Sequence, residues 1–327
     1  MTKFIFYVKV KSMRRRIVFC FLIIWIFSIN FAFPYWIWTP KTGKWVNPKY
    51  AVKPTPKEQL DFALSLYQEN KLKEAREEFK KLIKYFPRAK EAAEAQFYLG
   101  LIEEKSNRLY EAFLEYQKVI DKYPFSERIQ EIIERQYKIG EAFMEGKAKL
   151  GMGKNILVEH PSIEIFRKVV ENSTYGPLAP IAQYKLGLVL KSLGRFQEAE
   201  EEFEKVLSNY PNSEWFSAAK FQIASCKASL SRSPDYDQER TAEAKEMFEE
   251  FVKEHPDATL SKEAERNIEE LKEKEAKSNF DIGFFYERQK IYDSAKLYYN
   301  FVIENYPKSI WAAKAFERLQ ALEKKKR

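Results

Sequence analysis

Three residue types are scarce in this sequence, and each scarcity limits what the chain can do. Its 327 residues include two histidines, two cysteines and ten glycines. His160 and His255 both stand beside prolines, and no cysteine or carboxylate cluster has metal-ligand spacing, so the sequence predicts no metal, no cofactor and no enzyme activity. Cys20 lies in an N-terminal apolar run and Cys226 stands alone. A chain cleaved after that run could therefore form no intramolecular disulfide.

Positive charge is concentrated at the N-terminus. Six of the 56 Lys and Arg residues lie in residues 1–33, which contain no Asp or Glu. The rest of the chain carries a net charge of about +2, against +8 for the whole. It shows no basic stripe with interleaved aromatics, so the sequence predicts no nucleic-acid binding.

A glycine-containing stretch superficially suggests a phosphate-binding loop. It includes Gly146, Gly151, Gly153 and Lys154. That motif requires a preceding strand and Ser or Thr after the lysine, whereas Asn155 follows here and the preceding segment is predicted to be helical. We interpret the stretch as a loop between helices.

Residues 1–33 have the pattern of an export signal. Six basic residues precede an apolar run at 17–33 that only Ser28 and Asn30 interrupt. Met13 offers an alternative start, because Met-Arg-Arg-Arg and the apolar run already form a complete signal. Cleavage after Ala32 would remove the segment. Retention as a membrane anchor is the alternative.

Residues 34–56 form a separate segment with three tryptophans and several prolines. Prolines at this density prevent a continuous helix. The segment is predicted to be an ordered cap for the helices that follow. A second hypothesis is that its aromatics dock on those helices or at a membrane surface.

Four positions recur through the remaining chain at fixed spacing. Gly187, Ala199, Phe203 and Pro211 are separated by twelve, four and eight residues. This spacing predicts two amphipathic helices around a turn at 193–195, with small residues where the helices cross, an aromatic between them and a proline at the end. The same spacing occurs at Gly100, Ala112, Tyr116 and Pro124, at Gly283, Ala295, Tyr299 and Pro307, and at Ala63, Ala75, Phe79 and Pro87.

This spacing resembles the tetratricopeptide repeat and predicts an all-α solenoid of about six helical hairpins. Residues 57–258 would hold repeats one to five, with an insertion after Gly140 in the third and a late second helix in the fifth. Residues 259–327 would hold a long helix from about 260 to 289, repeat six and a final helix. A serine follows three of the repeat prolines and is predicted to cap the next helix: Ser126, Ser213 and Ser309.

Three longer stretches resemble the BamD family of outer-membrane protein assembly factors. They are NSTYGPLAPIAQYKLG at 172–187, DYDQERTAEAKEMFEEFVKEHP at 235–256 and YERQKIYDSAKLYYNFVIENYP at 286–307, and the resemblance extends over about 50–325. It implies a periplasmic protein at the inner face of the outer membrane that binds a β-barrel insertase with soluble periplasmic domains and helps recognise unfolded barrel precursors. The C-terminal repeats of that family hold the insertase, which implies a partner surface at 283–322.

Two other functions remain open at this point. One is a periplasmic repeat scaffold for cell-wall synthesis or division, similar to the CpoB class. The other is an adaptor on the cytoplasmic side or anchored in the membrane. Membrane association would come from partners or from an uncleaved N-terminal segment.

A candidate peptide-binding groove lies on the first helices of repeats one and two. The residues predicted to face it are unusually apolar for a solvated surface: Leu60, Leu64, Tyr67, Phe97 and Leu101. We expect them to receive the extended end of a barrel precursor. The alternative is that the aromatic residues at 36–45 cover them.

Overall fold

The computed structural model describes residues 36–39, 43–47, 51–148, 159–231, 238–256 and 259–325. The chain divides into two compact units, Met1–Gln59 and Leu60–Arg327. The predicted export signal at 1–33, with Cys20 and Ala32, lies outside the described residues. Within them, no helix is both long and apolar enough to cross a bilayer.

The N-terminal unit contains a short β-hairpin. Strand β1 (Ile37–Thr39) pairs antiparallel with β2 (Lys44–Val46), which places Trp38 opposite Trp45. Their rings meet edge to face with centroids 5.7 Å apart. Gly43 at the turn has φ +62°, a conformation that costs glycine little. The sequence predicted a non-helical segment here but not the strands.

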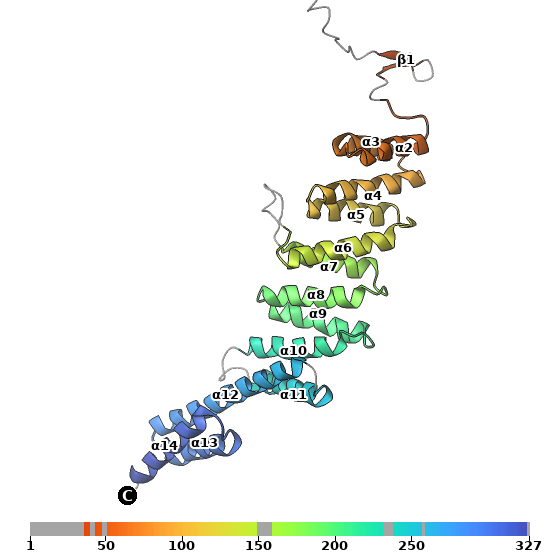
Figure 1. Cartoon of the computed structure of the whole chain (residues 1–327). Coiled ribbons are helices and arrows are strands. Elements are labelled where there is room, and N and C mark those ends of the chain that lie inside the picture. The colour runs from red at the N-terminus through yellow and green to blue at the C-terminus, as the bar shows by residue number, and fades with distance from the viewer. Residues whose placement is uncertain are drawn as a thin grey trace, which may run out of the picture. The chain divides into compact units, whose positions relative to one another are not determined.

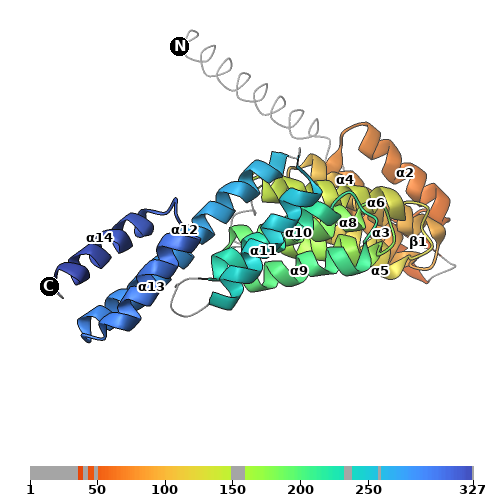
Figure 2. The ribbon, with the colours of Figure 1, turned by 90° about the horizontal axis from the view of Figure 1, so that it is seen from below.

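The helices of the larger unit are α2 (Pro56–Gln68), α3 (Leu72–Tyr85), α4 (Lys90–Lys105), α5 (Leu109–Lys122), α6 (Ile129–Met144), α7 (Pro161–Asn172), α8 (Ala179–Ser192), α9 (Phe196–Asn209), α10 (Phe216–Leu230), α11 (Gln238–Glu254), α12 (Thr259–Arg288), α13 (Tyr292–Asn305) and α14 (Ile310–Lys325). From α3 onward, each helix packs against the next along the chain (Figures 1 and 2). Ala63 of α2 shares a core with Ala75 and Phe79 of α3. From α2 to α13 the helices form six successive pairs in the described chain, which confirms the predicted hairpins.

Each hairpin closes on the predicted small and aromatic residues. A Cβ atom added at Gly100 would lie 2.3 Å from Cε1 of Tyr116, and one at Gly187 would lie 2.6 Å from Cε1 of Phe203. These distances are shorter than real Cβ contacts, so a side chain at Gly100 or Gly187 would displace the ring from its present position. In the interrupted third repeat, the ring of Phe166 packs against Gly140 in the same way. The insertion changes the sequence separation between this glycine and its aromatic residue.

The turn between the two helices of a hairpin contains a residue with positive φ in most repeats. The residue seven positions after the small residue has positive φ in four hairpins: Asn70, Asn107, Gly194 and Lys290. In the predicted turn at 193–195, the N–H of Arg195 donates to the carbonyl of Leu190 at 3.0 Å. This closes the end of the first helix as a Schellman motif.

The serines in the links between hairpins differ in their hydrogen bonds. Ser309 Oγ accepts from the N–H of Trp311 at 3.1 Å and caps α14, as predicted. Ser126 Oγ accepts from the N–H of Arg128 at 3.3 Å, but Arg128 precedes α6, so Ser126 does not cap that helix. Ser213 Oγ is buried without a hydrogen-bond partner, so the predicted cap at Ser213 is wrong.

Helix α12 belongs to two repeats. Its first half packs Ala264, Ile268 and Leu271 into a core with α10 and α11. Its second half contributes Ala276 and Phe280 to the core of α13 and α14. The predicted long helix is therefore confirmed, and repeats five and six share one uninterrupted backbone.

Candidate protein-interaction site

Polar side chains join the first helices of neighbouring hairpins at a repeated spacing. The residue four positions after the small glycine contacts the residue thirty-one positions further on, in the next hairpin or in α14. The three pairs are Glu104 with Arg135 at 3.1 Å, Lys191 with Gln222 at 2.6 Å, and Glu287 with Arg318 at 3.0 Å. We call these contacts rungs. Each one joins the first helix of a hairpin to the first helix of the next hairpin, or to α14.

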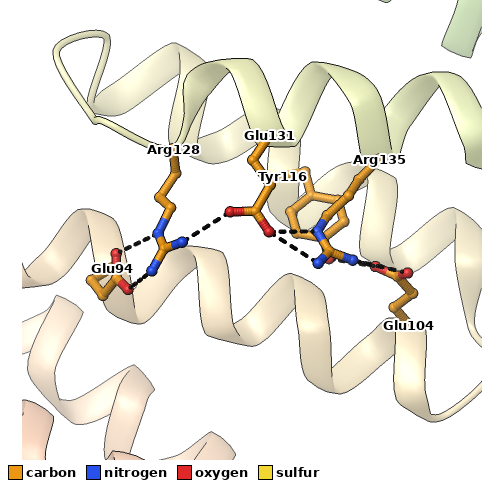
Figure 3. A network of polar contacts seen from close by, with 6 residues as sticks. All are labelled: Glu94, Glu104, Tyr116, Arg128, Glu131 and Arg135. Atoms are coloured by element: carbon orange, nitrogen blue, oxygen red, sulfur yellow. Dashed lines mark hydrogen bonds and ion pairs between the residues drawn. The ribbon is translucent and has the colours of Figure 1, made fainter.

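The rung between α4 and α6 is part of a longer network (Figure 3). Arg128 lies between Glu94 and Glu131, at 2.8 Å and 2.9 Å, and Arg135 lies between Glu131 and Glu104, at 3.0 Å and 3.1 Å. Burial raises the pKa of Glu131, but hydrogen bonds from Arg135 and Arg128 outweigh it, so that pKa is lowered. The charges along this face are therefore paired with one another.

The network changes the interpretation of one predicted groove residue. Phe97 is 2% exposed, and the guanidinium carbons of Arg128 and Arg135 lie 4.9 Å and 5.8 Å from its ring centroid. The prediction that Phe97 faces an open groove is wrong, because cations of the next hairpin cover its ring.

The other predicted groove residues are partly buried. Leu60, Leu64 and Tyr67 pack against the core of the first two hairpins, and Leu101 packs against the next core. The ammonium of Lys105 lies 4.1 Å from the ring centroid of Tyr67. Peptide binding by these four residues stays a prediction.

A more exposed apolar surface lies on α13. Leu297 is 64% exposed and Phe301 is 42% exposed, and a spacing of four places them on one face of the helix. We call these two residues the α13 stripe. The same two repeat positions carry Glu201 and Lys205 in repeat four. The stripe therefore replaces charged residues that are suited to water.

Phe285 on α12 is exposed for a different reason. In repeats two, four and five the equivalent position holds an apolar or cysteine side chain, and each is at most 3% exposed: Ile102, Val189 and Cys226. Phe285 is 57% exposed. In repeat two this position packs against the preceding hairpin. At Phe285 the continuous α12 takes the place of a separate helix, and the side chain stays uncovered.

A cleft of about 400 Å³ lies beside the α13 stripe. It is bounded by Glu239 and Thr241 of α11, Lys274 and Ser278 of α12, and Phe301 of α13, among others. One member of the stripe thus forms part of its wall. The cleft gives this surface a depression into which a partner side chain could fit.

Glu275 also lines that cleft. Its carboxylate lies 2.7 Å from the ammonium of Lys245 and accepts from the hydroxyl of Tyr306 at 3.3 Å. Burial, followed by the neighbouring negative charge of Glu275, raises the pKa of Tyr306 to about 12. The carboxylate therefore connects α11 with the chain just after α13 at the cleft.

The histidine and cysteine that could take part in catalysis or metal binding instead make structural contacts. His160 Nδ1 accepts from the N–H of Ser162 at the start of α7. Cys226 is buried, and burial raises its pKa to about 11, which keeps the thiol protonated. Across the described residues, no three His, Cys, Asp or Glu side chains are grouped as metal ligands. The stretch with Gly151, Gly153 and Lys154 lies outside the described residues.

Family comparisons agree with the repeat packing. Tetratricopeptide-repeat models match residues 60–127 and 181–213. The fold is a tetratricopeptide-repeat solenoid. The YfiO family of outer membrane lipoproteins matches residues 230–326, from the end of α10 through α14. This part of the solenoid is BamD-like, while the predicted resemblance over 50–325 was broader than the match.

Solved structures that resemble the chain include other repeat proteins. One is the C-terminal part of a TPR repeat-containing protein from Cytophaga hutchinsonii, with 19% identity, a TM-score of 0.35, and coverage of 80% of this chain and 87% of that one. Another is pilF of Pseudomonas aeruginosa, with 16% identity, a TM-score of 0.30, and coverage of 81% and 96%. No curated protein matches the chain.

The α13 stripe and Phe285 are the features that sequence reasoning missed. The region 283–322 was implied as a partner surface, but no residues within it were selected. A signal was present: aligning the repeats by their glycines puts Leu297 and Phe301 where repeat four has Glu201 and Lys205.

Proposed function

We propose that this chain is a BamD-like assembly factor that holds a β-barrel insertase through α12, α13 and α14 and helps recognise unfolded barrel precursors. It acts as a scaffold and not as an enzyme. Its place is the periplasm, at the inner face of the outer membrane, which it reaches by its N-terminal signal. Membrane association comes from its partners or from that segment if it is retained.

The coincidence of two independent features carries the proposal. The outer membrane lipoprotein match covers residues 230–326, and the α13 stripe, Phe285 and the adjoining cleft all lie inside it. Repeats one and four carry charged residues at both positions of the α13 stripe, Glu77 and Lys81 in one and Glu201 and Lys205 in the other. Exposed apolar side chains stabilise a complex when a partner buries them. Soluble periplasmic domains of an insertase are the partner that the resemblance implies.

Precursor recognition rests on the N-terminal repeats. Leu60, Leu64, Tyr67 and Leu101 keep part of their apolar surface accessible, and paired charges flank them in repeat two. An extended, alternately apolar barrel end would fit such a surface through its side chains. Phe97 has no direct role in this proposal, since Arg128 and Arg135 cover it.

The decisive experiment exchanges the α13 stripe for the residues of repeat four. We expect the double variant Leu297→Glu, Phe301→Lys to weaken binding to the purified soluble domains of the insertase by at least about a hundredfold, because each apolar anchor contributes about 1.5–3 kcal/mol. Isothermal titration calorimetry with the full chain measures the change.

A matched control uses exposed aromatics outside the proposed site. Phe125 and Tyr175 lie on links between hairpins and are each 99% exposed. Replacing both with serine should leave the affinity unchanged. Equal binding by the stripe variant and the wild-type chain, with both fully helical by circular dichroism, would refute the proposed docking surface.

A further inference from the structure

The N-terminal hairpin carries an exposed aromatic surface that the proposed function does not use. Trp36, Trp38 and Trp45 are 59%, 46% and 62% exposed. Trp38 and Trp45 are directly opposite in the ladder and therefore lie on one face of the hairpin. Trp36 precedes Trp38 by two residues, the spacing that returns to the same face of an extended chain. We call these three residues the tryptophan face.

The hairpin is short for an element that folds by itself in water. Each of its strands contains three residues. An isolated two-stranded hairpin is marginal without a further surface to cover one side. Ile37, which points away from Trp38 along the strand, is itself 50% exposed. A surface that buries the indoles would supply the missing stabilisation.

The charge of the surrounding sequence indicates what that surface is. Residues 34–57 contain five lysines and no aspartate or glutamate. The apolar run at 17–33 ends three residues before Trp36. Tryptophan is enriched at the boundary between lipid headgroups and water, and lysines near an anionic bilayer are attracted to its surface charge.

We infer that the tryptophan face binds the headgroup region of an anionic lipid bilayer. The indoles enter the interface, where their rings leave water and their N–H groups still find hydrogen-bond acceptors. The lysines of residues 34–57 attract the segment to that surface. This inference is independent of the proposed partner: the hairpin can bind lipid whether or not α13 binds an insertase.

Tryptophan fluorescence of the full chain tests this inference. Replacing Trp25, Trp215 and Trp311 with phenylalanine leaves the three residues of the tryptophan face as the only tryptophans. The variant is reconstituted with vesicles of phosphatidylcholine and phosphatidylglycerol, with or without bromine on the upper acyl chain. We expect the bromines to reduce the emission at least about twofold, since they lie near the interface that tryptophan occupies.

Two further measurements separate this inference from its alternative. Bromine at the centre of the bilayer should quench less than bromine near the headgroups, and lowering the phosphatidylglycerol content should weaken the quenching. If the tryptophans instead cover the first repeat, their emission will ignore brominated lipid and respond to Tyr67→Ala. That result, or emission unchanged by any vesicle, would overturn the inference.

Discussion

Repeat two (α4 and α5) and repeat six (the second half of α12, with α13) are built on the same internal plan. Both place a tyrosine against a glycine, and in both the tyrosine hydroxyl donates to a glutamate that an arginine of the next helix also contacts. The two sets are Gly100, Tyr116, Glu104 and Arg135, and Gly283, Tyr299, Glu287 and Arg318.

The two repeats differ in what covers them. Ile102 of repeat two is 1% exposed, whereas Phe285 at the same position of repeat six is 57% exposed. On the second helix, Lys118 of repeat two corresponds to Phe301 of repeat six. The same internal set of residues therefore coexists with a difference in exposure at one position and in charge at another. The internal residues determine the fold of a repeat, and the outer residues determine the surface that it presents.

Interrupting α12 should have the largest effect on stability, because the continuity of this helix distinguishes repeat six from repeat two. Glu269 lies mid-helix with its side chain 66% exposed. Proline there removes a helical hydrogen bond and clashes with the preceding turn, so we expect Glu269→Pro to lower the free energy of unfolding by about 3 kcal/mol or more. Thermal denaturation measures this, with Glu269→Ala as the control. Absence of a new protease-sensitive site near 269 would contradict it.

Replacing the repeat glycine with alanine should destabilise the two repeats by different amounts. A Cβ atom at Gly100 would approach Tyr116 to 2.3 Å, against 2.9 Å between Gly283 and Tyr299. Overpacking costs about 1–3 kcal/mol, so Gly100→Ala should lie near the upper end of this range and Gly283→Ala near the lower end. Urea denaturation of both variants gives the two values. A larger loss at Gly283 would show that backbone movement, not ring contact, decides the cost.

Removing the repeated tyrosine hydroxyl should have a smaller effect. Burial, followed by the hydrogen bond to Glu287, raises the pKa of Tyr299 to about 12. Because Glu287 keeps Arg318, Tyr299→Phe should cost about 1 kcal/mol. The folded protein holds the Tyr299 proton more tightly than the unfolded chain, so this contribution is complete below pH 10 and is lost as pH rises toward 12. A variant with the wild-type dependence on pH between 10 and 12 would exclude this contribution.

The smallest effect should come from the turn residue, and it should be stabilising. Lys290 has φ +64°, whereas the equivalent Asn107 has φ +55° and belongs to a residue type that tolerates this region. Relief of strain exceeds the entropy cost of glycine, so we expect Lys290→Gly to raise the free energy of unfolding by about 0.5–1 kcal/mol. Asn107→Gly should change it less. Melting temperatures of the two variants decide between them.

The sequence predicted the hairpins and the long helix, and it missed features that lie outside the repeat pattern. The spacing of Gly187, Ala199 and Phe203 identified four of the six hairpins, because close packing of two helices selects the same residue sizes at the same positions. The third and fifth hairpins carry insertions and were predicted from parts of the pattern. The covering of Phe97 was missed because it depends on arginines from the following hairpin, at a distance that no local pattern reports. The β-hairpin was missed because its strands contain only three residues.

The candidate site was predictable to the level of a region. The family resemblance implied 283–322, but the residues that distinguish this region emerge only from a comparison between repeats. A leucine such as Leu297 is unremarkable within one amphipathic helix. It becomes informative only when the structure shows it exposed at a position where repeat four has Glu201.

The uninterrupted α12 also affects how the protein opens. In a solenoid, local unfolding can stop at the link between two repeats, where few hydrogen bonds cross from one to the next. No such link exists between repeats five and six, because thirty residues from Thr259 to Arg288 share one hydrogen-bond ladder. Amide protons from α11 to α14 should therefore exchange with solvent as one cooperative block. The helices around the α13 stripe should then unfold together and not one repeat at a time.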